Sequence, residues 1–182
     1  MEEIIAGALY LVSTPIGNLS DISYRAVHIL KHVSLIAAED TRKTSILTQK
    51  YAIETALFPY HSYNQKTQTA RLVAKLKGGD TVALVSDAGT PGISDPAHAL
   101  VTACVAQNIR IIPIPGASAL LAALVSSGRP TNRFVFEGFL PLKKGRRSRP
   151  TIPRACGRRP ITFPPGLSTR KHHTRSAREP MP

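Results

Sequence analysis

The chain has 182 residues, of which 42% are hydrophobic, and it carries a formal net charge of +13. This length and this apolar content allow one domain with a sizeable core, or one domain and a fragment of another. No stretch is apolar for long enough to span a bilayer, the acidic start is unlike a signal peptide, and two cysteines cannot build a disulfide framework. We therefore expect a reduced, soluble, cytoplasmic protein that does not contact membranes.

The predicted elements alternate along residues 1–130, where short apolar runs separate amphipathic stretches. In chain order they are a strand at 8–13, a helix at 22–32, a strand at 33–38, a helix at 41–51, a weaker strand at 56–60, a helix at 64–76, a strand at 81–85, a helix at 97–107, a strand at 110–114, a helix at 117–127 and a further strand at 134–136. This alternation, with strands that are apolar almost throughout, predicts an α/β fold with a mostly parallel sheet flanked by helices.

Several residue types mark the ends of these elements. Ser20 or Asp21 is expected to cap the first helix, and Asp95 followed by Pro96 is a strong start signal for the fourth. Pro113 lacks a backbone N–H, which favours an edge or end position for the strand that contains it.

The positive charge lies near the end of the chain. Residues 1–142 hold 12 Lys or Arg and 10 Asp or Glu, whereas residues 143–182 hold 12 Lys or Arg and one acid. The same tail contains 7 of the 15 prolines and little hydrophobic periodicity. We expect the basic, Pro/Arg-rich residues 150–182 to be either a disordered RNA-binding arm or an out-of-frame product, and the abrupt change near residue 149 favours the second.

Three loops are candidates for function, because ligands of parallel sheets bind at the carboxyl ends of the strands. They are residues 13–21, 86–95 and 115–119. In the second loop, glycines allow a ligand to approach the backbone, and Asp87 offers an acceptor to a hydroxyl or an ammonium group. The alternative is that its glycines and prolines only turn a strand into a helix.

Several common site motifs are absent from the sequence. It contains no GxGxxG dinucleotide loop, no phosphate-binding GxxxxGK[ST], no HExxH and no CxxC pair. Hydride transfer, nucleotide hydrolysis and zinc chemistry are therefore disfavoured, and we expect no metal site.

Five motifs, in this order and spacing, resemble the tetrapyrrole-methylase superfamily. They are VSTPIGNLSDIS, AAEDTR, VSDAGTPGISDP, PIPGASALLAAL and FEGFLP, and the resemblance covers about residues 7–149. Within the superfamily they are similar to the enzymes that 2′-O-methylate a cytidine of 16S ribosomal RNA. Precorrin methylases typically have a GxGPGD-like first loop, whereas TPIGN is the variant similar to the RNA enzymes.

The resemblance implies a homodimeric, two-domain enzyme that binds S-adenosyl-L-methionine between its domains and acts on the decoding region of the small ribosomal subunit. Residues 1–130 would form the N-terminal domain, and residues 131–149 would begin a second α/β domain. The positions expected to contact the cofactor are Pro15, Gly17, Ser86, Asp87, Ala88, Gly89, Ile93, Ser118 and Ala119.

Methylation of a ribose hydroxyl benefits from a nearby base or a polarising cation. After the second strand, Asp40 is a candidate proton acceptor and Arg42 a candidate phosphate ligand, and His61 and Asn64 in the next loop are further catalytic candidates. The alternative is that Asp40 or Thr41 caps the following helix while Arg42 is solvated.

Three other interpretations remain open at this point. The first is that the chain is an inactive fragment of such an enzyme. The second is a precorrin-type tetrapyrrole C-methyltransferase, and the third is a non-enzymatic RNA-binding protein whose arm is the basic tail. Binding through the tail would fall steeply with salt.

Overall fold

The computed structural model describes residues 3–136 and 138. Two compact units divide the chain, Met1–Thr131 and Asn132–Pro182, and every helix and strand of the described part lies in the first. The predicted basic tail at 150–182 lies outside the described residues, as does most of the predicted start of a second domain at 131–149.

All ten helices and strands predicted within residues 1–130 are present, and the boundaries differ by only a few residues. They are β1 (Leu9–Val12), α1 (Tyr24–His32), β2 (Leu35–Ala38), α2 (Thr41–Lys50), β3 (Leu57–Pro59), α3 (Gln65–Lys77), β4 (Val82–Val85), α4 (Ala97–Ala106), β5 (Ile111–Ile114) and α5 (Ala119–Ser126). The strand predicted at 134–136 is wrong. Its three apolar side chains are 40–49% exposed, and these residues pair with no strand of the described part.

The five strands form one parallel sheet in the order β3-β2-β4-β1-β5. Leu9 of β1 is aligned with Val82 on one side and with Ile111 on the other. Strand β5 lies at the edge, which confirms the position predicted from Pro113, because proline cannot donate to a second neighbour.

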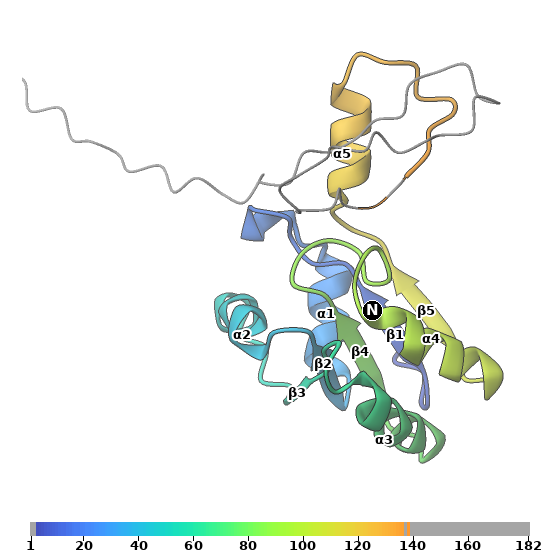
Figure 1. The fold of residues 1–182 in the computed structure, drawn as a ribbon. Helices are drawn as coiled ribbons and strands as arrows, with labels where there is room; N and C mark the ends of the chain where they lie inside the picture. Colours follow the sequence, from blue (N-terminus) through green and yellow to red (C-terminus); the bar gives the residue numbers. More distant parts are fainter. Residues whose placement is uncertain (1–2, 137, 139–182) are drawn as a thin grey trace, which may run out of the picture. The chain divides into compact units, whose positions relative to one another are not determined.

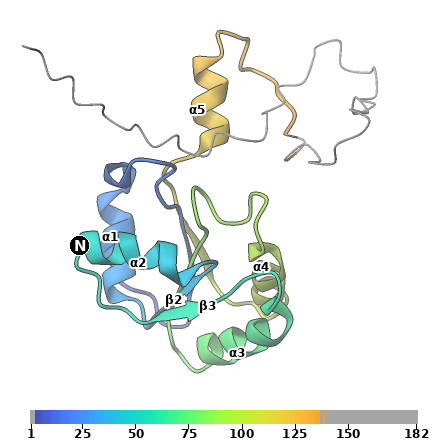
Figure 2. The ribbon, with the colours of Figure 1, turned by 60° about the vertical axis from the view of Figure 1, so that its left-hand side comes forward.

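Helices cover both faces of the sheet (Figures 1 and 2). Side chains alternate along each strand, so Tyr10 packs with α1 and α2 on one face while Leu9 packs with α3 and α4 on the other. Both side chains are 0–1% exposed. The predicted parallel α/β fold is confirmed, and it places all loops that follow strands at one edge.

Two predicted caps differ in detail from the structure. Helix α1 is capped by Ser23, whose Oγ accepts the Ala26 N–H at 3.1 Å, because an additional 3₁₀ turn (Leu19–Asp21) occupies the expected start. At α4, Asp95 accepts the Ala97 N–H at 2.9 Å, as a cap should, although Pro96 holds the N-cap position.

Candidate functional site

The loop after β1 is bound directly to the loop after β4. Thr14 and Gly89 exchange two backbone hydrogen bonds of 2.9 and 3.0 Å, and the Thr14 hydroxyl donates to the Ser86 carbonyl at 3.1 Å. The hydroxyl groups of Ser13 and Thr90 lie 3.0 Å apart. The two loops therefore form a single bonded structure rather than two independent turns.

The third loop packs against the same structure. Gly89 has a φ of +83°, and a Cβ there would lie 3.4 Å from Ile16 in the first loop and 3.7 Å from the Ala117 carbonyl in the third. At Gly116 a Cβ would meet the Ser13 Cβ at only 2.9 Å. Glycine at these two positions allows the three predicted loops to meet at one edge of the sheet.

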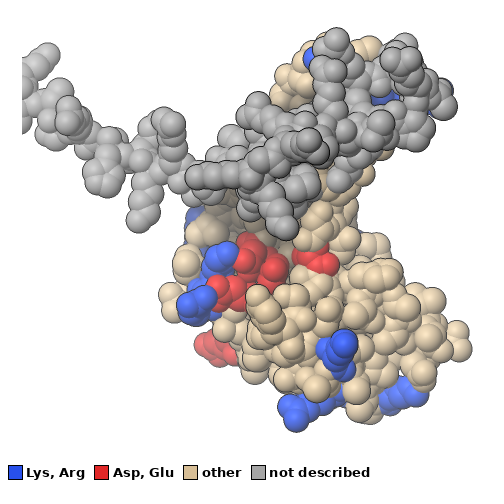
Figure 3. All heavy atoms as spheres, in the orientation of Figure 1, with Lys and Arg blue, Asp and Glu red and all other residues tan. Residues whose placement is uncertain are grey.

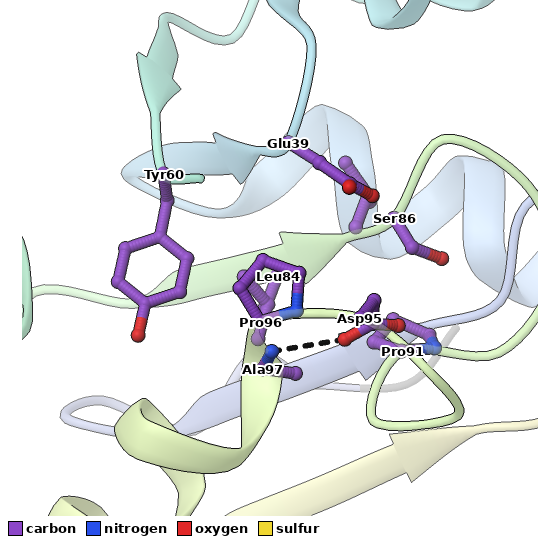
Figure 4. A pocket seen from close by; sticks show the side chains of 9 residues that line it. Glu39, Tyr60, Leu84, Ser86, Pro91, Asp95, Pro96 and Ala97 are labelled. Atoms are coloured by element: carbon purple, nitrogen blue, oxygen red, sulfur yellow. Dashed lines mark hydrogen bonds between the residues drawn. The ribbon is translucent and has the colours of Figure 1, made fainter. Parts of the chain in front are cut away.

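Two hollows open at this edge. The Asp87 hollow, about 50 Å³, is lined by Thr14, Pro15, Leu19, Lys43, Thr44, Leu47, Ser86 and Asp87. The Glu39 hollow, about 10 Å³, is lined by Glu39, Tyr60, Leu84, Val85, Ser86, Pro91, Asp95, Pro96 and Ala97 (Figure 4). Small-molecule sites usually enclose about 300–1,000 Å³, so neither hollow of the described residues encloses such a ligand by itself.

The structure brings the expected cofactor positions to this edge. Three of them, Pro15, Ser86 and Asp87, line the Asp87 hollow. Gly17, Ala88, Gly89 and Ile93 lie in the first two loops, and Ile93 is 47% exposed. In the third loop, Ser118 caps α5 by accepting the Leu121 N–H at 3.4 Å, and Ala119 is the first residue of that helix.

Asp40 and Arg42, two of the catalytic candidates, bind each other. The Asp40 carboxylate caps α2 by accepting the Arg42 backbone N–H at 3.0 Å, and it also pairs with the Arg42 guanidinium at 2.8 and 3.0 Å. These bonds lower the pKa of Asp40 to about 2. This confirms the capping alternative for Asp40 and makes its carboxylate a weak proton acceptor, so its catalytic role stays a prediction.

Asp87 is held in place but incompletely bonded. One oxygen forms an ion pair with Lys43 of α2, whereas its buried Oδ1 has no hydrogen-bond partner among the described residues. A buried acceptor without a donor is costly, and a ligand hydroxyl, amine or ammonium group would satisfy it.

Glu39 is a site residue that sequence reasoning missed. It follows the last residue of β2, and its carboxylate accepts the Asp87 backbone N–H at 3.3 Å. Burial is the main cause that raises its pKa, and the neighbouring carboxylates of Asp87 and Asp95 add to the effect. The AEDTR motif indicated a carboxylate at this strand end, but not which of two adjacent acids faces the loop after β4.

The loop after β3 is a hydrogen-bonded turn that contains His61 and Asn64. The Asn64 side chain accepts the His61 backbone N–H at 2.9 Å and donates to the Pro59 carbonyl at 3.0 Å, so its polar groups shape the turn. The buried Nδ1 of His61 has no partner among the described residues. The His61 ring lies edge-on to the ring of Tyr63, which is 97% exposed.

Within the described ranges, no three His, Cys, Asp or Glu side chains gather as a metal site would require. None of the helices in that same part of the chain is both long and apolar enough to cross a membrane.

A parallel α/β sheet with three interlocked loops at its carboxyl edge is typical of a ligand-binding enzyme domain. The family of the domain follows from its sequence. A sequence model of the tetrapyrrole (corrin/porphyrin) methylases matches residues 8–163, and the chain belongs to this family. The resemblance inferred from the motifs is thereby confirmed.

Curated relatives are similar over most of this chain. A protein of Synechocystis sp. named ribosomal RNA small subunit methyltransferase I is 61% identical over 137 residues, which cover 75% of this chain and 49% of the relative. One of the same name from Pseudomonas aeruginosa is 54% identical over 145 residues, 79% of this chain and 51% of the relative. The chain thus spans about half the length of the curated relatives it matches.

A solved structure shows the same fold. The crystal structure of uroporphyrin-III-C-methyltransferase from Thermus thermophilus is similar with a TM-score of 0.53 and 23% identity, covering 68% of this chain and 53% of that one. At this identity the likeness supports the architecture alone.

Proposed function

We propose that this chain carries the cofactor-binding domain of an S-adenosyl-L-methionine-dependent methyltransferase that modifies the 2′-hydroxyl of a cytidine in 16S ribosomal RNA. The identity of 61% and 54% to relatives named for methylation of small-subunit ribosomal RNA carries the proposal. The choice of a cytidine ribose rests on the motif resemblance. A cytoplasmic location and a homodimer belong to the same proposal.

The residues at the sheet edge fit this cofactor. The Oδ1 of Asp87, which has no partner among the described residues, matches a ligand that carries hydroxyl, amine and ammonium donors. Because Gly89 has no side chain, the backbone of the second loop lies directly against the neighbouring loops. When bound, the cofactor supplies a methyl group on a positively charged sulfur. Pro15, Ser86 and Asp87 would hold part of it at the Asp87 hollow.

Residues on the neighbouring loops are suited to RNA. The Arg42 side chain is 88% exposed at the N-terminus of α2, where a phosphate can be bound. Tyr63 offers an exposed ring for stacking of an unpaired base. Beside it, the Nδ1 of His61 has no partner within the part of the chain that the structure describes. Holding the ribose hydroxyl in line with the methyl group would supply much of the rate.

Calorimetric titration of the 182-residue chain with S-adenosyl-L-methionine tests the cofactor assignment. Asp87→Ala should weaken binding by roughly tenfold, because it removes a buried acceptor and its ion pair. Asp80→Asn is the control, since Asp80 precedes the amino end of β4 and pairs with Lys75 on the surface. Absence of binding by the unmodified chain would contradict the proposal.

Transfer of labelled methyl groups to small ribosomal subunits that lack the modification tests the substrate. Transfer to the 2′-hydroxyl of one cytidine is the expected result. Transfer to a small tetrapyrrole instead of RNA would favour the precorrin-type alternative. Cofactor binding without any transfer would identify a binding domain that is inactive alone.

A further inference from the structure

The peptide unit that joins Ser86 to Asp87 is held on both sides by side chains from other loops. Its carbonyl, which belongs to Ser86, accepts the Thr14 hydroxyl at 3.1 Å. Its N–H, which belongs to Asp87, donates to the Glu39 carboxylate at 3.3 Å. Figure 4 shows the Glu39 side chain extending from the end of β2 toward Ser86. Because a peptide unit is planar, two bonds at its opposite ends fix the orientation of the whole unit.

The bond from Thr14 is buried and joins two distant parts of the chain. Thr14 and Ser86 are 5% and 7% exposed, and they lie 72 positions apart in the sequence. Water therefore competes little for either group. Removing the hydroxyl would leave the Ser86 carbonyl without this donor, which is costly for a buried acceptor.

The side chain of Asp87 begins at this fixed peptide unit. One of its oxygens pairs with Lys43 of α2, and its buried Oδ1 has no partner among the described residues. Figure 3 shows acidic side chains near the carboxyl ends of the strands, with basic side chains beside them over α2. Thr14, Ser86 and Asp87 all line the Asp87 hollow. The held peptide and the pair with Lys43 together set the direction of the free acceptor.

We propose that Thr14 and Glu39 are positioning residues, which act through the Ser86–Asp87 peptide unit and preorganise Asp87 for a hydroxyl or amine donor of S-adenosyl-L-methionine. The inference rests on the proposed function, which supplies this ligand. An acceptor that is already oriented binds more tightly, because less ordering accompanies binding. The affinity should therefore depend on the hydroxyl of Thr14 rather than its size, and on the acceptor oxygen of Glu39 rather than its charge.

Calorimetric titration of the full chain with S-adenosyl-L-methionine tests this inference. Thr14→Val keeps the shape of the side chain without its hydroxyl and should weaken binding by about tenfold, whereas Thr14→Ser keeps the hydroxyl and should change binding by less than about twofold. Glu39→Gln keeps an acceptor and should also change binding by less than about twofold. Glu39→Met removes both oxygens and should weaken binding by about fivefold.

Thr81→Val is the matched control for Thr14→Val. Thr81 is 6% exposed, and its hydroxyl oxygen accepts the Ser34 backbone N–H at 2.8 Å. It precedes β4 at the amino end of the sheet, away from the candidate site. Thermal melts followed by circular dichroism should show that both valine variants fold and that both are less stable than the unmodified chain. Only Thr14→Val should lose affinity.

The Asp87→Ala background separates positioning from a general loosening of the loops. If Thr14 acts through Asp87, adding Thr14→Val to Asp87→Ala should weaken binding by less than about twofold more. The inference is overturned if Thr14→Val binds as tightly as the unmodified chain, if it costs about tenfold in the Asp87→Ala background as well, or if Thr81→Val weakens binding equally. Absence of binding by the unmodified chain would instead contradict the proposed function.

Discussion

Helix α5 is more apolar in sequence than α4, yet it is the less buried of the two. Along α4, Ala97, Leu100 and Cys104 are 0–2% exposed, whereas α5 buries Leu124 alone. Leu121 is 53% exposed on the latter helix. Apolar composition therefore does not decide burial by itself.

The position of each helix relative to the sheet explains the difference. Helix α4 lies on a face of the sheet beside α3, and its apolar side chains join those of β4 in one core cluster. Helix α5 follows the edge strand β5 and extends past the carboxyl end of the sheet (Figures 1 and 2). The three loops of the candidate site lie at the same edge, so the third loop joins a buried part of the fold to an exposed one.

The same substitution in the two helices should give the largest difference in stability. Leu100→Ala leaves a cavity in the core and should lower the free energy of unfolding by about 2–5 kcal/mol. Leu121→Ala removes a side chain that is 53% exposed and should cost less than about 1 kcal/mol. Urea denaturation followed by circular dichroism measures both values. Equal losses would show that α5 is packed in solution as tightly as α4, which would contradict the difference in burial.

Element type and order could be predicted from sequence because short, continuously apolar runs alternate with longer amphipathic stretches. Local capping could not, since four cap-type residues precede α1 and only the 3₁₀ turn at Leu19–Asp21 makes Ser23 the cap. The strand predicted at 134–136 was wrong because three apolar residues in a row do not supply a strand to pair with.

The candidate site was predictable to the level of loops rather than side chains. The positions of Ser86 and Asp87 follow from the end of β4, since parallel strands share one carboxyl edge. Which of Glu39 and Asp40 caps α2 and which faces β4 depends on backbone geometry that adjacent residues do not reveal. Likewise, an asparagine at position 64 does not reveal from sequence that its side chain forms hydrogen bonds within its own turn.

An intermediate effect is expected at Gly116, where the buried and exposed regions meet. Gly116→Ala places a methyl group 2.9 Å from the Ser13 Cβ, so the first and third loops must separate. We expect a loss of about 1–3 kcal/mol in the free energy of unfolding, together with weaker binding of S-adenosyl-L-methionine.

Gly128→Ala separates the two effects of that substitution. Gly128 has a φ of +66°, and no atom of residues 3–136 or 138 lies within 4 Å of an added Cβ, so alanine there strains the backbone, at about 1–2 kcal/mol. Cofactor affinity should remain unchanged in this variant. If Gly116→Ala behaves in the same way, the contact between the first and third loops does not shape the site.

The smallest effect is expected at Asp40, which caps α2 at the surface rather than in the core. Because its pKa in the folded chain is lowered to about 2 from 3.8, Asp40 stabilises the fold above the higher value, and this contribution is lost as the pH falls from about 4 to about 2. Asp40→Asn keeps a capping oxygen but removes the charge, so the melting temperatures of the variant and the unmodified chain should converge over that interval. Arg42→Gln, which removes the partner, should reduce the same pH-dependent difference, and the double variant should lose no more than either single one. A difference that persists unchanged down to pH 2 would show that the pair with Arg42 does not stabilise α2.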